Sequence, residues 1–299
     1  MKLCKISSEN IRARIRHDRS PDAGQGGARH RGQSGYGKAV IPIGRERGTV
    51  LTIETLCLFG LPIHNATLPE ALAWILYAPP PPPGIKLYFV NAHCVNVMHS
   101  DRAYREALLR ADGLFADGTG MRWAARALGH RLRDNVNGTD LFPLLCRALP
   151  GSGLRIFLLG GEPGIAERMR DRIGAQYPGL NICGTHHGFF LPDENDQIIQ
   201  LIQDVKTDLL LVAMGVPRQE LWLDRHLEQT GARVGLGVGG LFNFYSGAVP
   251  RAPVWMRRAG LEWLHRLYQE PGRLWKRYLI GNGWFLWRLA GEWMKQRMS

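Results

Sequence analysis

Polar residues and glycines follow several apolar runs of this sequence, at points where buried strands would end. Asn91 closes the first run, and Asp117-Gly118 closes the second. Gly160-Gly161 and Gly239-Gly240 follow two later runs. Because ligands bind at the carboxyl ends of the strands in open parallel sheets, we predict that these four junctions line one site. The candidate ligand-binding residues at the junctions are Asn91, Gly118, Gly160, Gly161, Gly239 and Gly240.

Asp117 is the candidate catalytic residue. It follows the short apolar run Leu114–Ala116 and precedes Gly-Thr-Gly, so its carboxylate is expected to project from a strand end. A carboxylate placed there can take a proton from a substrate hydroxyl, which is the role of a general base. The alternative is that Asp117 only caps the helix expected to begin near Thr119.

Two junctions, one of them named above, could hold a nucleotide. Gly160–Gly164 opens a helix whose N-terminal N–H groups suit a phosphate, although a GG-x-x-G turn is also common as a plain tight turn. Gln219 follows Gly-x-Pro, where its amide could reach a ligand or simply belong to a helix start. No P-loop occurs, and the Gly160–Gly164 turn is not a G-x-G-x-x-G followed by an acidic residue at the expected distance, so neither a P-loop NTPase nor a typical NAD-binding protein is indicated.

Metal chemistry is not indicated by the residue types. The sequence has no Asp-x-Asp, and the adjacent His186 and His187 would point to opposite faces of a strand. We therefore expect no metal and no other cofactor. Negative charge on a departing group would instead be met by helix ends and arginines. The C-terminal segment supplies such arginines at positions Arg251, Arg257, Arg258, Arg266, Arg273 and Arg277.

The segments between the junctions alternate between strand and helix patterns. This alternation predicts an α/β fold, a Rossmann-like, mostly parallel sheet with helices on both faces. The expected strands are Leu114–Ala116, Ile85–Val90, Leu154–Leu159, Leu180–Cys183, Asp208–Met214 and Arg233–Val238. The expected helices are Leu68–Leu76, Ala103–Ala111, Met121–Leu128, Asp140–Leu149, Gly164–Tyr177, Asn195–Val205 and Gln219–Gln229. The proline run Pro79–Pro83 is expected to be a stiff, extended spacer.

Charge and composition divide the chain into three parts. Residues 1–50 carry 11 Lys or Arg against 4 Asp or Glu, and residues 251–299 carry 10 against 3, so both ends are basic within a total of +12. Residues 1–50 have few large apolar side chains, which predicts a disordered basic extension. Nucleic-acid binding by this extension is the alternative. Residues 51–253 are expected to form the α/β core.

Residues 254–299 are expected to form a helical appendage, broken near Glu270-Pro271-Gly272. This segment holds six of the nine tryptophans. At helical spacing, one apolar stripe is formed by Trp275, Leu279, Leu286, Ala290 and Trp293. Tryptophan beside arginine and lysine suits an amphipathic helix that docks on an anionic membrane. The alternative is a helical hairpin packed on the core.

The remaining composition favours a reducing compartment. The five cysteines are scattered without C-x-x-C spacing, the first residues lack the apolar region of a secretory signal, and no run of 18 apolar residues occurs. We expect a cytoplasmic protein attached peripherally to the inner membrane.

The junctions, taken in order, resemble the WecG/TagA/CpsF family of bacterial glycosyltransferases, glycosyltransferase family 26. The resemblance covers roughly residues 56–280 in eight collinear blocks. The blocks are VNAHCVN with DRAYREAL, ADGLFADGTGMRWAARALG, NGTDLF, FLLGGEPGIAE, YPGLNICGTHHGFF, LLLVAMGVPRQELWL, GVGGLFNFYSGAVPRAP and GLEWLHRLYQEPGRLWKRYL.

The resemblance implies an inverting, metal-independent transferase. It would move a hexose or N-acetylhexosamine from a UDP-sugar to an undecaprenyl-diphosphate-linked saccharide, in cell-surface or exopolysaccharide synthesis. Asp117 would be the base, Asn91 and Gln219 match the family's Asn and Gln, and Thr139 lies in the Gly-Thr-Asp block. The family's appendage arginines are best matched by Arg266, Arg273 and Arg277.

Two departures from the family pattern leave the sugar open. Phe89 stands where many members have Thr, and Asn135 where many have Arg, with Arg133 close enough to substitute. The rival function is a nucleotide-cofactor-dependent oxidoreductase on a Rossmann-like sheet. No nucleic-acid partner is expected. The residues do not determine the oligomeric state, and a homo-oligomer is one of the alternatives.

Overall fold

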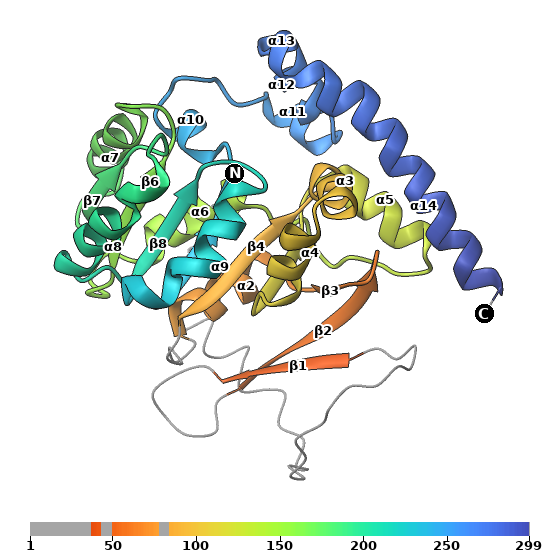
Figure 1. The fold of residues 1–299 in the computed structure, drawn as a ribbon, viewed down its shortest axis with the longest axis horizontal. Helices are drawn as coiled ribbons and strands as arrows, with labels where there is room; N and C mark the ends of the chain where they lie inside the picture. The colour runs from red at the N-terminus through yellow and green to blue at the C-terminus, as the bar shows by residue number, and fades with distance from the viewer. Residues whose placement is uncertain (1–36, 43–49, 78–83, 299) are drawn as a thin grey trace, which may run out of the picture.

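A computed structural model describes residues 37–42, 50–77 and 84–298 of the chain (Figure 1). Its centre is a six-stranded sheet in which every neighbouring pair of strands is parallel. The strand order is β5-β4-β9-β8-β6-β7. The strands are β4 (Ile85–Val90), β5 (Gly113–Ala116), β6 (Arg155–Gly160), β7 (Asn181–His186), β8 (Leu209–Ala213) and β9 (Val234–Gly237). The predicted parallel sheet is confirmed.

Helices cover both faces of this sheet, as predicted. Alternate residues of each strand face opposite layers: Leu87 and Phe89 of β4 lie in one core, and Tyr88 and Val90 in the other. The first layer contains α2 (Leu68–Tyr77), α6 (Gly138–Ala148), α7 (Ile165–Gln176) and α10 (Leu241–Tyr245). The second contains α3 (Ala92–Ser100), α4 (Arg102–Leu109), α5 (Thr119–Ala127), the short η1 (Pro192–Glu194), α8 (Asn195–Asp204) and α9 (Arg218–Thr230).

A second, antiparallel sheet precedes the central one and was not predicted. It consists of β1 (Gly37–Pro42), β2 (Val50–Leu58) and β3 (Leu61–His64) in the order β1-β2-β3. Strand β1 lies within the segment for which composition predicted disorder, because pairing with β2 supplies backbone hydrogen bonds that composition does not reveal. The rest of that segment, residues 1–36 and 43–49, and the proline run 79–83 lie outside the described residues.

The C-terminal appendage is helical, and its predicted break at Glu270 is confirmed. Glu270 has a non-helical backbone conformation between α12 and α13. The appendage consists of α11 (Val254–Arg258), α12 (Glu262–Gln269), α13 (Pro271–Trp275), the π-helical turn η2 (Lys276–Ile280) and α14 (Gly281–Met298). Helix α14 runs past α3 and α5 (Figure 1). None of the helices in the part of the chain described here has the length and apolar character to cross a membrane.

The appendage has two apolar faces. Phe285 and Leu289 are buried against the second core, and the Asn96 amide donates to the Gly281 carbonyl at 2.7 Å. Three residues of the predicted stripe remain exposed: Trp275, Leu279 and Trp293 are 42%, 61% and 39% exposed. Packing of the appendage on the core is therefore confirmed in part, and membrane docking stays a prediction.

Candidate active site

A cavity of about 460 Å³ lies between the carboxyl edge of the central sheet and the appendage. One side of the cavity is formed by the residues that follow β4, β5, β8 and β9. The opposite side is formed by α12, α13, η2 and α14. These four strands are neighbours in the sheet, which brings together segments far apart in the chain. Ten of the twelve predicted site residues line the cavity: Asn91, Asp117, Gly118, Thr139, Gln219, Gly239, Gly240, Arg266, Arg273 and Arg277.

Gly160 and Gly161 are not among the residues that line this cavity. Gly160 is the last residue of β6 and Gly161 follows it, and β8 lies between β6 and β9 in the sheet. A Cβ on Gly160 would meet the backbone of Ala213 at 2.6 Å, and the Gly161 amide donates to the Ala213 carbonyl at 3.0 Å. These glycines therefore permit a close approach between two strand ends, as in the tight-turn alternative.

The Asp117 carboxylate lies at the end of β5 and is partly exposed to the cavity. Burial raises the pKa of Asp117 to about 6, and Glu262 acts in the same direction. The hydrogen bond from Asn91 and the charges of Arg266 and Arg277 oppose this rise in pKa. A carboxylate with this pKa is ionised at pH 7 and holds a proton more tightly than a free Asp, which suits a general base.

Asp117 does not act as the helix cap that the sequence allowed. The N-cap of α5 is Gly118, which has a φ of 88°. Among the described residues, the only hydrogen bond to the Asp117 carboxylate comes from the Asn91 amide at 3.4 Å. Asn91 is itself held in place, because its Oδ1 accepts from the amides of His93 and Cys94 as the N-cap of α3. The carboxylate is thus oriented by a fixed neighbour and left free toward the cavity.

Two cavity residues gain a role only from the structure. Asn135 Oδ1 accepts from the Gly118 amide at 2.6 Å and so supports the turn after Asp117. Arg133, which was considered as a substitute at this point, instead pairs with Glu70 at 2.8 Å and does not line the cavity. His93 does line it, and burial and the charge of Arg277 lower the pKa of His93 to about 4, which leaves the ring neutral at pH 7.

The cavity wall formed by the appendage carries unpaired positive charge. Arg266 and Arg277 each have a buried Nε without a hydrogen-bond partner, and neither forms an ion pair with any residue that the structure describes. Arg273, by contrast, pairs with Glu270 at 2.5 Å. Their guanidinium groups stack on the rings of Phe244 and Tyr278 and have no carboxylate partner, so they suit a polyanion such as a diphosphate.

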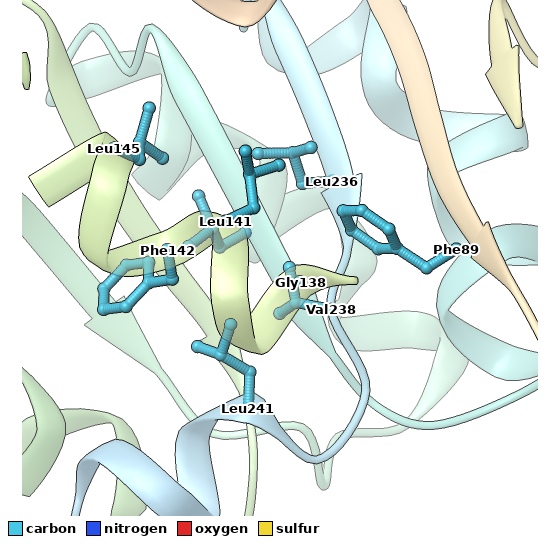
Figure 2. Close-up of a pocket in the computed structure, with 9 residues that line it drawn as sticks. Phe89, Gly138, Leu141, Phe142, Leu145, Leu236, Val238 and Leu241 are labelled. Carbon is cyan, nitrogen blue, oxygen red and sulfur yellow. The ribbon is translucent and has the colours of Figure 1, made fainter. Parts of the chain in front are cut away.

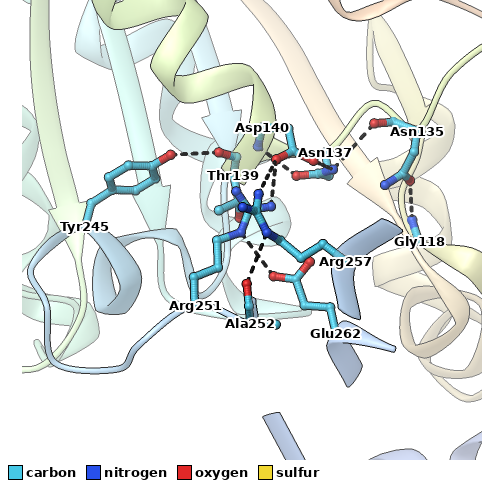
Figure 3. Close-up of polar contacts among 10 residues, drawn as sticks. All are labelled: Gly118, Asn135, Asn137, Thr139, Asp140, Tyr245, Arg251, Ala252, Arg257 and Glu262. Carbon is cyan, nitrogen blue, oxygen red and sulfur yellow. Dashed lines mark hydrogen bonds and ion pairs between the residues drawn. The ribbon is translucent and has the colours of Figure 1, made fainter. Parts of the chain in front are cut away.

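An ionic network joins the appendage to helix α6 at the cavity rim (Figure 3). Arg251 donates to Asp140 at 2.7 Å and to Glu262 at 3.2 Å, and Arg257 lies 3.8 Å from the same Asp140 carboxylate. Asp140 is fixed in turn by two hydrogen bonds with Asn137, the N-cap of α6. The network therefore connects the start of α6 to α11 and α12.

Arg251→Leu is expected to lower the free energy of unfolding by about 1–3 kcal/mol, because two carboxylates lose a partly buried partner. Hydrogen exchange should quicken in α12 more than in α7. The matched control is Arg102→Leu, since Arg102 is 92% exposed in its pair with Glu106 and should cost less than about 0.5 kcal/mol. Equal losses in the two variants, measured by urea denaturation, would contradict the proposed link.

A second pocket lies beneath this cavity but is too small and too apolar for a polar substrate. Its volume is about 10 Å³, and it shares Phe89, Gly138, Val238 and Leu241 with the lining of the main cavity. Figure 2 shows the surrounding side chains as hydrocarbon throughout. A pocket of this size at best matches one water molecule, and its lining offers no polar side chain to hold one. It is a packing gap under the site.

Comparison with known proteins assigns the chain to a family. The model of the glycosyl transferase WecG/TagA/CpsF family matches residues 56–299. The chain belongs to this family. A Bacillus subtilis (strain 168) relative, named N-acetylglucosaminyldiphosphoundecaprenol N-acetyl-beta-D-mannosaminyltransferase, is 31% identical over 196 residues, which are 66% of this chain and 75% of the relative. A Staphylococcus aureus (strain MRSA252) protein of the same name is 28% identical over 234 residues, covering 77% of this chain and 90% of the relative.

This WecG/TagA/CpsF protein is therefore a glycosyltransferase, as the collinear blocks indicated. Membership favours sugar transfer over the oxidoreductase alternative, since its relatives are named as transferases. Within the described residues, no group of three or more His, Cys, Asp or Glu is arranged to hold a metal ion. The groups that line the cavity include the carboxylates of Asp117 and Glu262, a neutral imidazole, backbone amides and arginines.

Proposed function

We propose that this protein transfers a hexose or N-acetylhexosamine from a UDP-sugar to an undecaprenyl-diphosphate-linked saccharide, by a metal-independent, inverting reaction. The observation that carries the proposal is one cavity with the Asp117 carboxylate on the sheet side and, on the appendage side, two arginines that form no ion pair with a described residue. The relatives' names supply the class of acceptor, since they describe transfer to an N-acetylglucosaminyl-diphosphoundecaprenol.

The reaction is a single displacement. Asp117 removes the proton of the acceptor hydroxyl as its oxygen attacks the anomeric carbon. The bond from that carbon to the diphosphate oxygen breaks, and its electron pair leaves with UDP. Attack from the face opposite the leaving group inverts the anomeric configuration. Arg266 and Arg277 would stabilise the negative charge that develops on the diphosphate, which is the task a metal ion performs in other transferases.

The exposed face of the appendage supports docking at an anionic inner-membrane surface, on the cytoplasmic side. Trp275, Leu279 and Trp293 are exposed there, and the Arg297 guanidinium lies 4.0 Å from the centre of the Trp293 ring. Leu286 is exposed as well and also lines the cavity. An apolar path from the cavity to the surface of α14 would let a polyprenyl chain remain in lipid while its saccharide reaches Asp117.

The proposal predicts UDP release from a defined pair of substrates. Incubation with a panel of UDP-sugars and lipid-diphosphate acceptors should release UDP with one donor class, and only when an acceptor is present. The product should carry the inverted anomeric configuration by NMR. EDTA should leave the rate unchanged, because arginines stabilise the leaving group. Retention of configuration, or a rate abolished by EDTA and restored by Mg²⁺, would refute the mechanism.

A further inference from the structure

Gln219 joins two loops of the cavity wall. Its Oε1 accepts hydrogen bonds from the backbone amide of Gly215, after β8, at 3.2 Å, and from that of Gly239, after β9, at 3.0 Å. Both loops line the cavity, and the side chain of Gln219 is only 3% exposed. The Gln219 carbonyl is therefore fully engaged by the protein. Its contribution to ligand binding passes through the two glycines that it holds.

Glu220 determines which way this amide faces. The Gln219 Nε2 donates to Glu220 Oε1 at 2.8 Å, and the Glu220 side chain is completely buried. Because Glu220 Oε1 accepts this hydrogen bond, the NH₂ end of the Gln219 amide points to Glu220 and its carbonyl points to the two glycine amides. Gly237 leaves room for this arrangement, since a Cβ there would lie 3.1 Å from the Gln219 Nε2.

The surroundings of Glu220 disfavour the charged form of its carboxyl and so lower the stability of the fold. Its Oε2 has no hydrogen-bond partner among the described residues. It faces Tyr88 of β4, Cys94 of α3 and Tyr104 of α4. Burial raises the pKa of each of these groups, and the charge of Glu220 adds to the rise. Burial raises the pKa of Glu220 to about 7, which the hydrogen bond from Gln219 opposes. A buried carboxyl with one unused oxygen destabilises the fold, and such costs are typically retained at functional sites.

We propose that Glu220 is a positioning residue: through Gln219 it aligns the Gly215 and Gly239 loops that receive the nucleotide of the sugar donor. Glu220 touches no substrate itself. The inference rests on the proposed function for the identity of the donor. The alignment of the two loops, however, is a property of the free protein and can be measured without any substrate.

The test compares Glu220→Leu with Glu220→Gln, using Glu228→Leu as the control on the exposed side of the same helix. Leucine leaves the Gln219 amide without its acceptor, so the KM for the UDP-sugar should rise about 10-fold while the KM for the lipid acceptor changes little. Glutamine offers a neutral carbonyl acceptor of the same shape and should restore most of the donor affinity. A loss of stability in Glu220→Leu with an unchanged donor KM would show a merely structural role.

Two further measurements separate this inference from the proposed function. Without substrate, hydrogen exchange at the Gly215 and Gly239 amides should quicken in Glu220→Leu and stay near wild type in Glu220→Gln. In a Gln219→Ala background, Glu220→Leu should cause no further rise in the KM for the UDP-sugar, because the effect of Glu220 passes through Gln219. Wild-type exchange at both glycines in Glu220→Leu would overturn the inference even if UDP-sugars prove to be the donors. Failure of every UDP-sugar with wild-type protein would refute the proposed function and leave the exchange result to decide on Glu220.

Discussion

Asp117→Asn is expected to reduce turnover by at least about 10²-fold while leaving the fold intact, because a general base typically contributes about 10²–10⁴-fold. The asparagine carbonyl can still accept from the Asn91 amide, and the hydrogen bond from the Gly118 amide to Asn135 is unaffected. UDP release under saturating donor and acceptor measures the effect. Near-normal turnover would remove Asp117 from the mechanism. Asp193→Asn, at an exposed position, is the control and should leave the rate unchanged.

The pH dependence of the wild type should report the same carboxylate. Because burial raises the pKa of Asp117 to about 6, the base is lost to protonation as the pH falls through that value. Turnover should therefore decline below about pH 6, whereas an ordinary Asp would sustain it to about pH 4. A flat rate from pH 7 to pH 5, with the fold intact by circular dichroism, would contradict the assignment.

The same raised pKa makes a prediction about stability. A carboxyl whose pKa is higher in the folded protein than in the unfolded chain favours the fold at low pH, and this contribution disappears as the pH rises through about 6. At pH 7 the ionised Asp117 thus destabilises the protein by at most about 3 kcal/mol, since each pKa unit corresponds to about 1.4 kcal/mol. Asp117→Asn should raise Tm at pH 7 by roughly 2–6 °C and have little effect at pH 4.

Replacing the exposed apolar stripe of the appendage is expected to abolish most membrane binding. In the triple variant Trp275→Gln, Leu279→Gln and Trp293→Gln, three large exposed side chains become polar without removing the buried contacts of Phe285 and Leu289. Burying a large apolar side chain contributes about 1.5–3 kcal/mol, so losing part of this at three positions should weaken binding to anionic vesicles at least about 30-fold. Co-sedimentation with vesicles at two salt concentrations measures the loss.

The controls for the appendage distinguish docking from catalysis. The double variant Phe189→Gln and Leu191→Gln replaces two apolar side chains elsewhere on the surface, which are 63% and 64% exposed. It should leave vesicle binding unchanged. The triple variant should also keep its activity on a short-chain, water-soluble acceptor, because none of its three positions lines the cavity. Equal vesicle binding by the triple variant and the wild type would refute docking through this face.

Local sequence patterns were sufficient for most elements of the central sheet. Strands such as β4 and β8 are short apolar runs, and helices such as α7 and α9 show amphipathic spacing with recognisable ends. The antiparallel sheet was missed although part of its signal is local: β2 alternates buried and exposed residues, and Leu58 pairs with Leu61 across a two-residue turn. Helix α3 was missed because it begins directly after its N-cap Asn91, inside what the sequence suggests is a loop.

The site itself divides in the same way. Asp117 could be predicted from a carboxylate after a strand, and the arginines from the basic appendage. The exclusion of Gly160 could not, because it follows from the position of β6 beyond β8 in the sheet. Glu220 could not be predicted either, since its importance depends on the loops after β8 and β9 meeting at the side chain of Gln219.

The sequence by itself thus determined the class of fold and the family, and it placed a candidate carboxylate at a strand end, because these depend on residue types and spacing along the chain. Only the tertiary structure decided which strand ends share a cavity and which face of α14 is buried. It also decided that Arg266 and Arg277 form no ion pair with a described residue. Strand order, helix rotation and charge pairing are set by contacts between distant segments, and the free energies of these contacts do not appear in any local pattern.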